Sequence, residues 1–156
     1  MVLPGVRRAW IPAGLVAGLA GAIAMDAFLL TAHWPGVAAP NPVEHYTFIA
    51  SAVAGSAAIG ASWAVPLGIV LHLIVAIGWS FGYLAAVEQQ PQILRTWFPS
   101  GIVFGIVVWI VMVALLIPIG KYQPATSHAF DRDIIAHTLF FGLPLAFVAS
   151  RLIRQA

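Results

Sequence analysis

Residues 63–87 read WAVPLGIVLHLIVAIGWSFGYLAAV, and this stretch decides the fold. It contains no aspartate, glutamate, lysine or arginine. An α-helix crosses the roughly 30 Å hydrocarbon core of a bilayer with about 20 predominantly apolar residues. We therefore predict a membrane-spanning helix here, and one histidine, His72, interrupts its apolar character.

Three further stretches have similar length and character, which predicts an all-α membrane protein. The four predicted transmembrane helices form a single domain over residues 1–156 and lie at about 10–32, 63–87, 98–119 and 134–153. The composition agrees, because 62% of the residues are hydrophobic and 8% are charged, against roughly 25% charged residues in soluble domains. The lipid bilayer is thus the expected partner. The net charge of +2 comes from dispersed residues, so nucleic-acid binding is not expected.

The connection between the first two spans is predicted to contain a short helix. Three prolines at positions 35, 40 and 42 prevent one continuous helix at its start. Asn41 can cap a helix whose first residue is Pro42. The stretch 43–58 is moderately apolar but too short to span. We expect an interfacial or re-entrant helix in the first outer loop.

The basic residues predict the orientation, because lysine and arginine accumulate on the cytoplasmic side of membrane proteins. In a four-span arrangement Lys121 and Arg132 fall on one side. The larger group falls on the other side and consists of Arg7, Arg8, Arg95, Arg151 and Arg154. Both termini are therefore predicted to be cytoplasmic, and the first connection is predicted to face outward.

Ionisable side chains inside the predicted spans are the candidates for function. Asp26 lies in the first span, His72 in the second and His137 in the fourth. A charged side chain at the centre of a membrane helix costs about 3 kcal/mol, so such residues face protein or water and mark a working site. His33, His45, His128 and Glu44 lie outside the spans and are weaker candidates.

Imidazole and carboxylate groups suit a zinc, copper, iron or nickel ion, so Asp26, His72 and His137 are the candidate metal ligands. Asp133 lies four residues before His137, and its carboxylate is predicted to hold that imidazole in one tautomer. Aspartate and histidine can also relay protons. The site is therefore predicted to bind either a metal ion or protons.

Two alternatives stay open beside this prediction. His72 and His137 could instead ligate haem b from opposite sides, as occurs in bundle cores, and make the protein an electron carrier. Glycine pairs at 14/18 and 101/105 allow close helix packing, either within the chain or against another membrane protein or a second copy. The second alternative is thus an accessory subunit of a larger membrane complex.

Catalysis has little support in the sequence. The chain has no cysteine, which excludes thiolate chemistry and cysteine metal ligands. It has no H-E-x-x-H motif, no nucleophile elbow and no phosphate-binding loop. We expect a protein that binds a ligand rather than one that catalyses a reaction.

Several positions along the chain carry a family resemblance. They are Tyr46-Thr47-Phe48, His72, Gly82-Tyr83, and Asp133 four positions before His137. On these residues the chain is similar to the YagU-like family of small bacterial inner-membrane proteins. The resemblance implies a multi-pass protein of the bacterial inner membrane, with a link to acid tolerance and without an established reaction. It also implies supporting roles for Tyr46, Tyr83 and Asp133 beside the two histidines.

Overall fold

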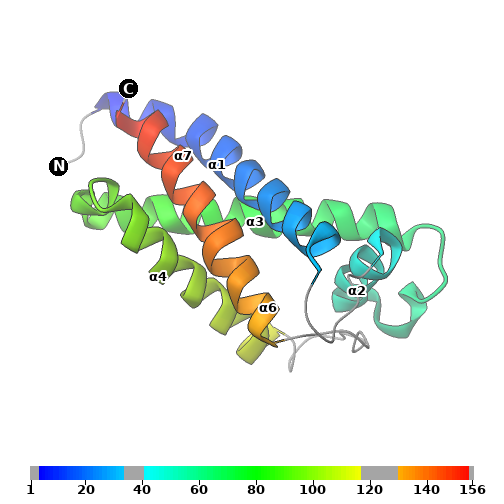
Figure 1. The fold of residues 1–156 in the computed structure, drawn as a ribbon. Helices are drawn as coiled ribbons and strands as arrows, with labels where there is room; N and C mark the ends of the chain where they lie inside the picture. The colour runs from blue at the N-terminus through cyan, green and yellow to red at the C-terminus, as the bar shows by residue number, and fades with distance from the viewer. Residues whose placement is uncertain (1–3, 34–40, 117–129, 155–156) are drawn as a thin grey trace.

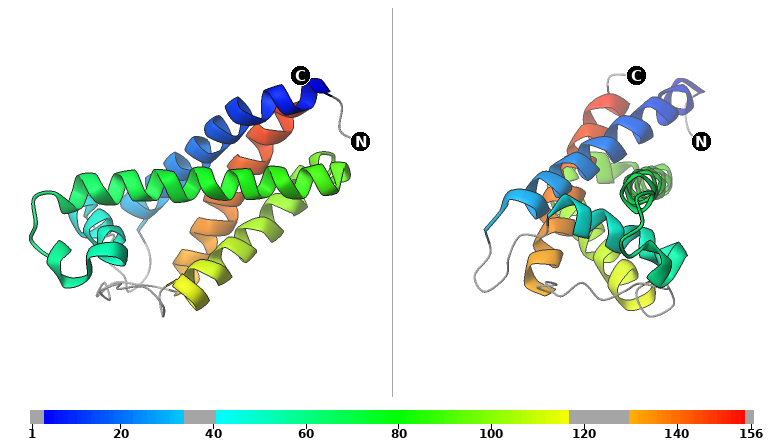
Figure 2. Two further views of the ribbon diagram at one scale, coloured as in Figure 1. Left: turned by 180° about the vertical axis from the view of Figure 1, so that it is seen from behind. Right: turned by 90° about the vertical axis from the view of Figure 1, so that its right-hand side faces the viewer.

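The computed structural model describes residues 4–33, 41–116 and 130–154, and every regular element in these ranges is helical. The α-helices α1, α3, α4 and α7 form a bundle, with α2 against one end of α3 (Figures 1 and 2). The elements in chain order are α1 (Pro4–Thr31), α2 (Pro42–Ala54), η1 (Gly55–Ala58), α3 (Ala64–Gln89), η2 (Pro91–Leu94), α4 (Trp97–Ile110), η3 (Val111–Leu116), α6 (Phe130–Ile135), η4 (Ala136–Gly142) and α7 (Leu143–Arg154). The all-α prediction is confirmed over these residues.

Several helices are apolar enough to cross a membrane. The three that are also long enough are Ala9–Thr31, Ala64–Gln89 and Asp131–Arg154, which match three of the four predicted spans. A fourth apolar helix, Trp97–Val113, is shorter. Residues 117–119 of the predicted span 98–119 lie outside the described residues.

Large apolar side chains cover the outside of the bundle. Ile23, Ile74 and Val103 on three different helices are each exposed by 60% or more. Exposing such a surface to water is unfavourable in free energy, and large contiguous apolar patches are rare on soluble monomeric proteins. The outside is therefore suited to lipid, as the composition predicted.

The predicted helix in the first connection is present and begins where its cap predicts. The Asn41 side chain accepts a 2.9 Å hydrogen bond from the Glu44 backbone N–H, and Pro42 is the first helical residue. The helix α2 packs against α3, where the Gly68 position meets the backbone of Tyr46. A Cβ at Gly68 would overlap the Tyr46 carbonyl group, so glycine is what allows α2 to lie this close.

Both glycine pairs pack inside the chain. A Cβ at Gly18 would press on the backbone of Ile77 in α3, and one at Gly105 would press on the backbone of His137 in η4. The Ser80 hydroxyl donates a 2.5 Å hydrogen bond to the Gly14 carbonyl oxygen, which joins α1 to α3. The helix surfaces around these glycines, which could have contacted another protein, instead contact helices of the same chain.

The helix predicted at 134–153 is not uniform. It consists of α6, η4 and α7, and η4 is a π-helical segment that contains His137. A second π-helical segment, η3, extends α4. A π-helical turn widens the helix locally and is frequent at functional sites, so the position of these two segments bears on the site below.

Candidate functional site

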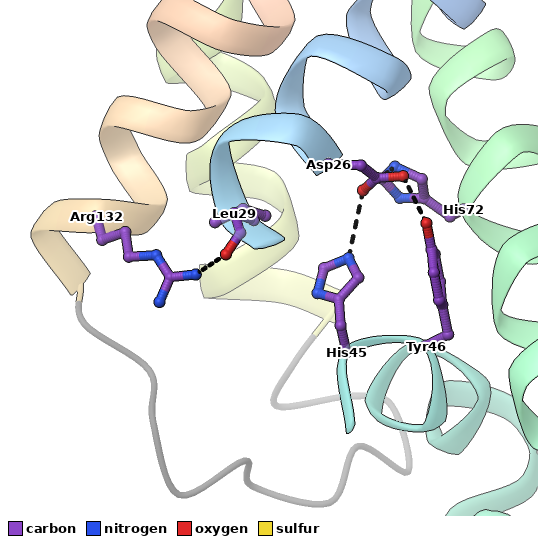
Figure 3. Close-up of polar contacts among 6 residues, drawn as sticks. All are labelled: Asp26, Leu29, His45, Tyr46, His72 and Arg132. Atoms are coloured by element: carbon purple, nitrogen blue, oxygen red, sulfur yellow. Dashed lines mark hydrogen bonds and ion pairs between the residues drawn. The ribbon is translucent and has the colours of Figure 1, made fainter. Parts of the chain in front are cut away.

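A carboxylate, two imidazoles and a phenol meet where α1, α2 and α3 come together (Figure 3). We call Asp26, His45, Tyr46 and His72 the Asp26 cluster. Oδ1 of Asp26 lies 3.1 Å from Nε2 of His72 and 3.4 Å from Nε2 of His45. The Tyr46 hydroxyl donates a 2.9 Å hydrogen bond to Oδ2. Both carboxylate oxygens are therefore engaged.

The helix α2 supplies half of the cluster. His45 and Tyr46 lie in its first turns, and its packing against α3 carries both side chains to Asp26 on α1. From the sequence His45 is a weak candidate, because it lies in the connection between two predicted spans. One sequence feature does favour His45: it lies next to Tyr46 on a short helix that Asn41 caps.

The residues of the Asp26 cluster are largely buried, which strengthens the electrostatic interactions among them. The side chains of Asp26, His45 and His72 are exposed by only 17%, 12% and 10%. Oδ1 and both Nε2 atoms are fully covered, and neither imidazole contact is aligned as a regular hydrogen bond. A buried carboxylate is costly unless positive or hydrogen-bonding groups surround it. The two imidazoles and the phenol provide that environment.

The Tyr46 phenol is a permanent donor at neutral pH. Partial burial and the hydrogen bond to the Asp26 carboxylate raise the pKa of Tyr46 from 10.0 to about 12. Ionisation would place a phenolate beside a carboxylate, which explains the direction of the shift. Tyr46 thus attaches α2 to α1 throughout the physiological pH range.

His137 is held by a different kind of partner. Its Nδ1 lies 2.8 Å from the Asp133 backbone carbonyl oxygen. Because a carbonyl oxygen can only accept, Nδ1 must carry the hydrogen in this contact. Asp133 therefore positions His137 through its main-chain carbonyl, whereas the prediction gave that role to its carboxylate.

His72 and His137 face a common pocket of about 40 Å³ within the bundle. Its walls come from α1, α3, α4, η3 and η4, and they consist of Met25, His72, Val75, Ala76, Trp79, Val108, Met112, His137 and Phe141. Both π-helical segments of the described residues contribute to it, η3 through Met112 and η4 through His137. The two histidines that the sequence singled out are thus brought to one place.

Asp26, the third predicted ligand, lies on the other side of His72. It contacts the His72 ring but is not part of the pocket wall. Among the described residues, no three histidine, cysteine, aspartate or glutamate side chains are grouped so that they could hold a metal ion. The predicted set of Asp26, His72 and His137 is therefore not one set of ligands. Asp26 is instead placed to orient His72.

The haem alternative does not fit the pocket. A cavity measured in this way needs about 10–15 Å³ to hold one water molecule, so a volume of about 40 Å³ is far below that of a haem macrocycle. The His72 Nε2 atom is also directed at Asp26 rather than across the pocket. A pair of axial ligands would need both imidazoles to point at a shared iron.

A family model described as a family of unknown function, DUF6789, matches residues 9–156. The chain belongs to this family. The matched range contains the whole Asp26 cluster and the whole pocket. No curated protein and no solved structure matches the chain. The similarity to the YagU-like family stays a prediction beside the DUF6789 assignment.

The remaining candidates have other positions in this DUF6789 chain. Tyr83 is fully buried, and its hydroxyl lies 2.9 Å from the Ser100 hydroxyl, which joins α3 to α4 away from the pocket. His33 and Glu44 are exposed, and His128 lies outside the described residues. Of these, Tyr83, His33 and Glu44 belong neither to the cluster nor to the pocket wall.

Arg132 is a buried residue whose place the sequence did not predict. It is exposed by only 2%, and its guanidinium donates to the Leu29 carbonyl near the end of α1 (Figure 3). A cation near a helix C-terminus stabilises the unpaired carbonyl groups there. Arg132 thus fastens α6 to the end of α1, one turn beyond Asp26.

Proposed function

We propose that this protein is a non-enzymatic, four-span protein of the bacterial inner membrane whose bundle binds a transition-metal ion between His72 and His137. The Asp26 cluster is the outer support of that site. Both termini lie in the cytoplasm in this proposal. The common end of the bundle that holds the start of α1 and the end of α7 supports that topology (Figure 1).

One observation carries the proposal: each pocket histidine has one ring nitrogen next to an oxygen acceptor outside the pocket. Nε2 of His72 lies at the Asp26 carboxylate, and Nδ1 of His137 binds the Asp133 carbonyl oxygen. Metal-binding histidines almost always contact a carboxylate or a main-chain carbonyl through the nitrogen that does not bind the metal. In both residues the other ring nitrogen, Nδ1 of His72 and Nε2 of His137, is the one that binds the ion in this proposal.

Binding is favoured over catalysis by the state of the serine hydroxyls. Ser51, Ser80 and Ser150 are buried and donate to main-chain carbonyl oxygens. A hydroxyl with such a bond is not presented to a histidine base as a nucleophile. The predicted alternative of an accessory subunit loses part of its basis, because the glycine pairs pack within the chain.

The experiment is metal analysis of the detergent-purified protein after equilibration with Zn²⁺, Ni²⁺ and copper. We expect bound metal in the wild type and its loss in His72→Ala and His137→Ala. His33→Ala is the matched control, since His33 is exposed at the end of the first span, and it should keep the metal. Equal metal content in all four proteins would refute the proposal.

A wild-type protein that binds no metal would also refute it. The proton version predicted from the sequence would then be examined through proton uptake by the same proteins. Uptake that depends on His72 but not on His33 would assign the site to protons.

A further inference from the structure

We infer that the metal ion is monovalent copper, held by the thioethers of Met25 and Met112 together with the imidazoles of His72 and His137. The inference rests on the proposed function, which leaves the identity of the ion open. Its starting point is the composition of the pocket wall, where two sulfur side chains accompany the two histidines.

The distribution of sulfur in the chain is the first argument. The sequence contains three methionines and no cysteine. Apart from Met1, every methionine lines this one pocket. Thioethers are soft ligands that select Cu(I), whereas Zn²⁺ and other harder ions favour thiolate, imidazole or carboxylate groups. The two thioethers therefore favour Cu(I) over Zn²⁺ at this site.

The apolar wall is the second argument. Val75, Ala76, Val108 and Phe141 supply much of the remaining lining. The free energy needed to transfer an ion from water to such surroundings grows with the square of its charge. Desolvation therefore opposes a divalent ion far more strongly than a monovalent one.

Local charge is the third argument. Asp26 carries a negative charge next to His72, and the hydrogen bond that it accepts comes from the neutral Tyr46 phenol. Arg132, the nearest buried cation described, is engaged with the Leu29 carbonyl at the end of α1. One positive charge in the pocket would balance Asp26, and a Cu⁺ ion supplies one.

The position of η3 and η4 agrees with a built site. Met112 lies in η3 and His137 in η4, so two of the four proposed donors come from π-helical segments. Forming such a segment gives up the regular hydrogen-bond pattern of the α-helix, and it is retained mostly where function requires it. Here it sets the direction from which these two side chains enter the pocket.

The test compares Cu(I) and Zn²⁺ affinities of the full-length protein under anaerobic, reducing conditions, with a chromogenic chelator as competitor. The variants are Met25→Leu, Met112→Leu and the double substitution, since leucine and methionine are close in volume. We expect the double variant to bind Cu(I) more weakly by more than about tenfold, the loss that even an outer partner of a metal ligand causes. Its Zn²⁺ affinity should be unchanged.

The outcomes separate the two claims. Cu(I) affinity that the methionine variants leave unchanged, while His72→Ala abolishes binding, would overturn the copper inference and keep the metal site. Binding of no metal by the wild type would overturn both. X-ray absorption at the copper edge gives an independent readout: we expect sulfur scattering in the wild type, and a spectrum with nitrogen scattering alone would refute the assignment. If the double variant fails to fold, the spectra of the single variants decide.

Discussion

The Asp26 cluster and the pocket share one side chain, His72, and differ in almost everything around it. On the cluster side, the Asp26 carboxylate contacts the His72 Nε2 atom and is itself contacted by the His45 imidazole and the Tyr46 phenol. On the pocket side, the walls are apolar apart from the imidazoles, the indole of Trp79 and the two thioethers. One side is built to hold the imidazole in place, and the other is built to receive a ligand.

The largest effect should come from breaking the attachment of α2. Gly68→Val places a side chain where the Tyr46 backbone lies, and a main-chain overlap cannot be relieved by a rotamer change. We expect the free energy of unfolding to fall by about 3 kcal/mol or more, measured by denaturant titration in detergent. His45 and Tyr46 would leave Asp26.

Gly78 provides the matched control for that substitution. It lies on the same helix, and a Cβ built there has nothing within 4 Å. Gly78→Ala should therefore stabilise the protein by up to about 1 kcal/mol, because alanine favours the helix. If both glycine substitutions had equal effects, the packing of α2 on α3 would not be the cause.

A smaller effect is expected from removing the charge that supports His72. Asp26→Asn retains the shape of the side chain but takes the carboxylate away from Nε2. We expect metal affinity to fall by about 10- to 100-fold, the usual cost of losing such a partner. Competition with a chelator measures it. An affinity equal to that of the wild type would mean that the cluster does not support the pocket.

Arg132 should affect stability without affecting the pocket. Arg132→Ala removes the donor to the Leu29 carbonyl at the end of α1. We expect a loss of about 1.5–3 kcal/mol, typical of a hydrogen bond to a charged group, with unchanged metal affinity. A large change in affinity would contradict the separation between this contact and the site.

The smallest effect concerns the phenol. Because folding raises the pKa of Tyr46 to about 12 from an ordinary value of 10.0, its stabilising contribution is complete below pH 10 and is lost as the pH rises through 12. Tyr46→Phe should cost about 1 kcal/mol at neutral pH. It should also remove an ionisation step near pH 12 from the tyrosinate absorbance. Loss of a step near pH 10 in its place would contradict the Tyr46–Asp26 hydrogen bond.

Much of the fold could be predicted because apolar length and cap residues act locally. Asn41 and Pro42 predict the start of α2, and residues 63–87 predict α3. The π-helical segments could not be predicted in this way, because their sequences are as apolar as the α-helices around them. Tertiary packing, such as Gly105 against the His137 backbone, decides them.

The site was only half predicted for the same reason. Ionisable side chains are unfavourable inside a membrane helix, and this singled out Asp26, His72 and His137. Of these, His72 and His137 line the pocket. Met25 and Met112 carry no local signal, because a methionine in an apolar helix is ordinarily part of the core. Only the meeting of α1, α3, η3 and η4 shows that both methionines and both histidines border one space.

A double-mutant cycle on metal affinity tests the central claim most directly. His72→Ala and His137→Ala are measured singly and together, with His33→Ala as the exposed control. If both imidazoles bind one ion, each single substitution should remove most of the affinity, and the double substitution should add little. Independent and additive losses would show two separate sites and would contradict the account.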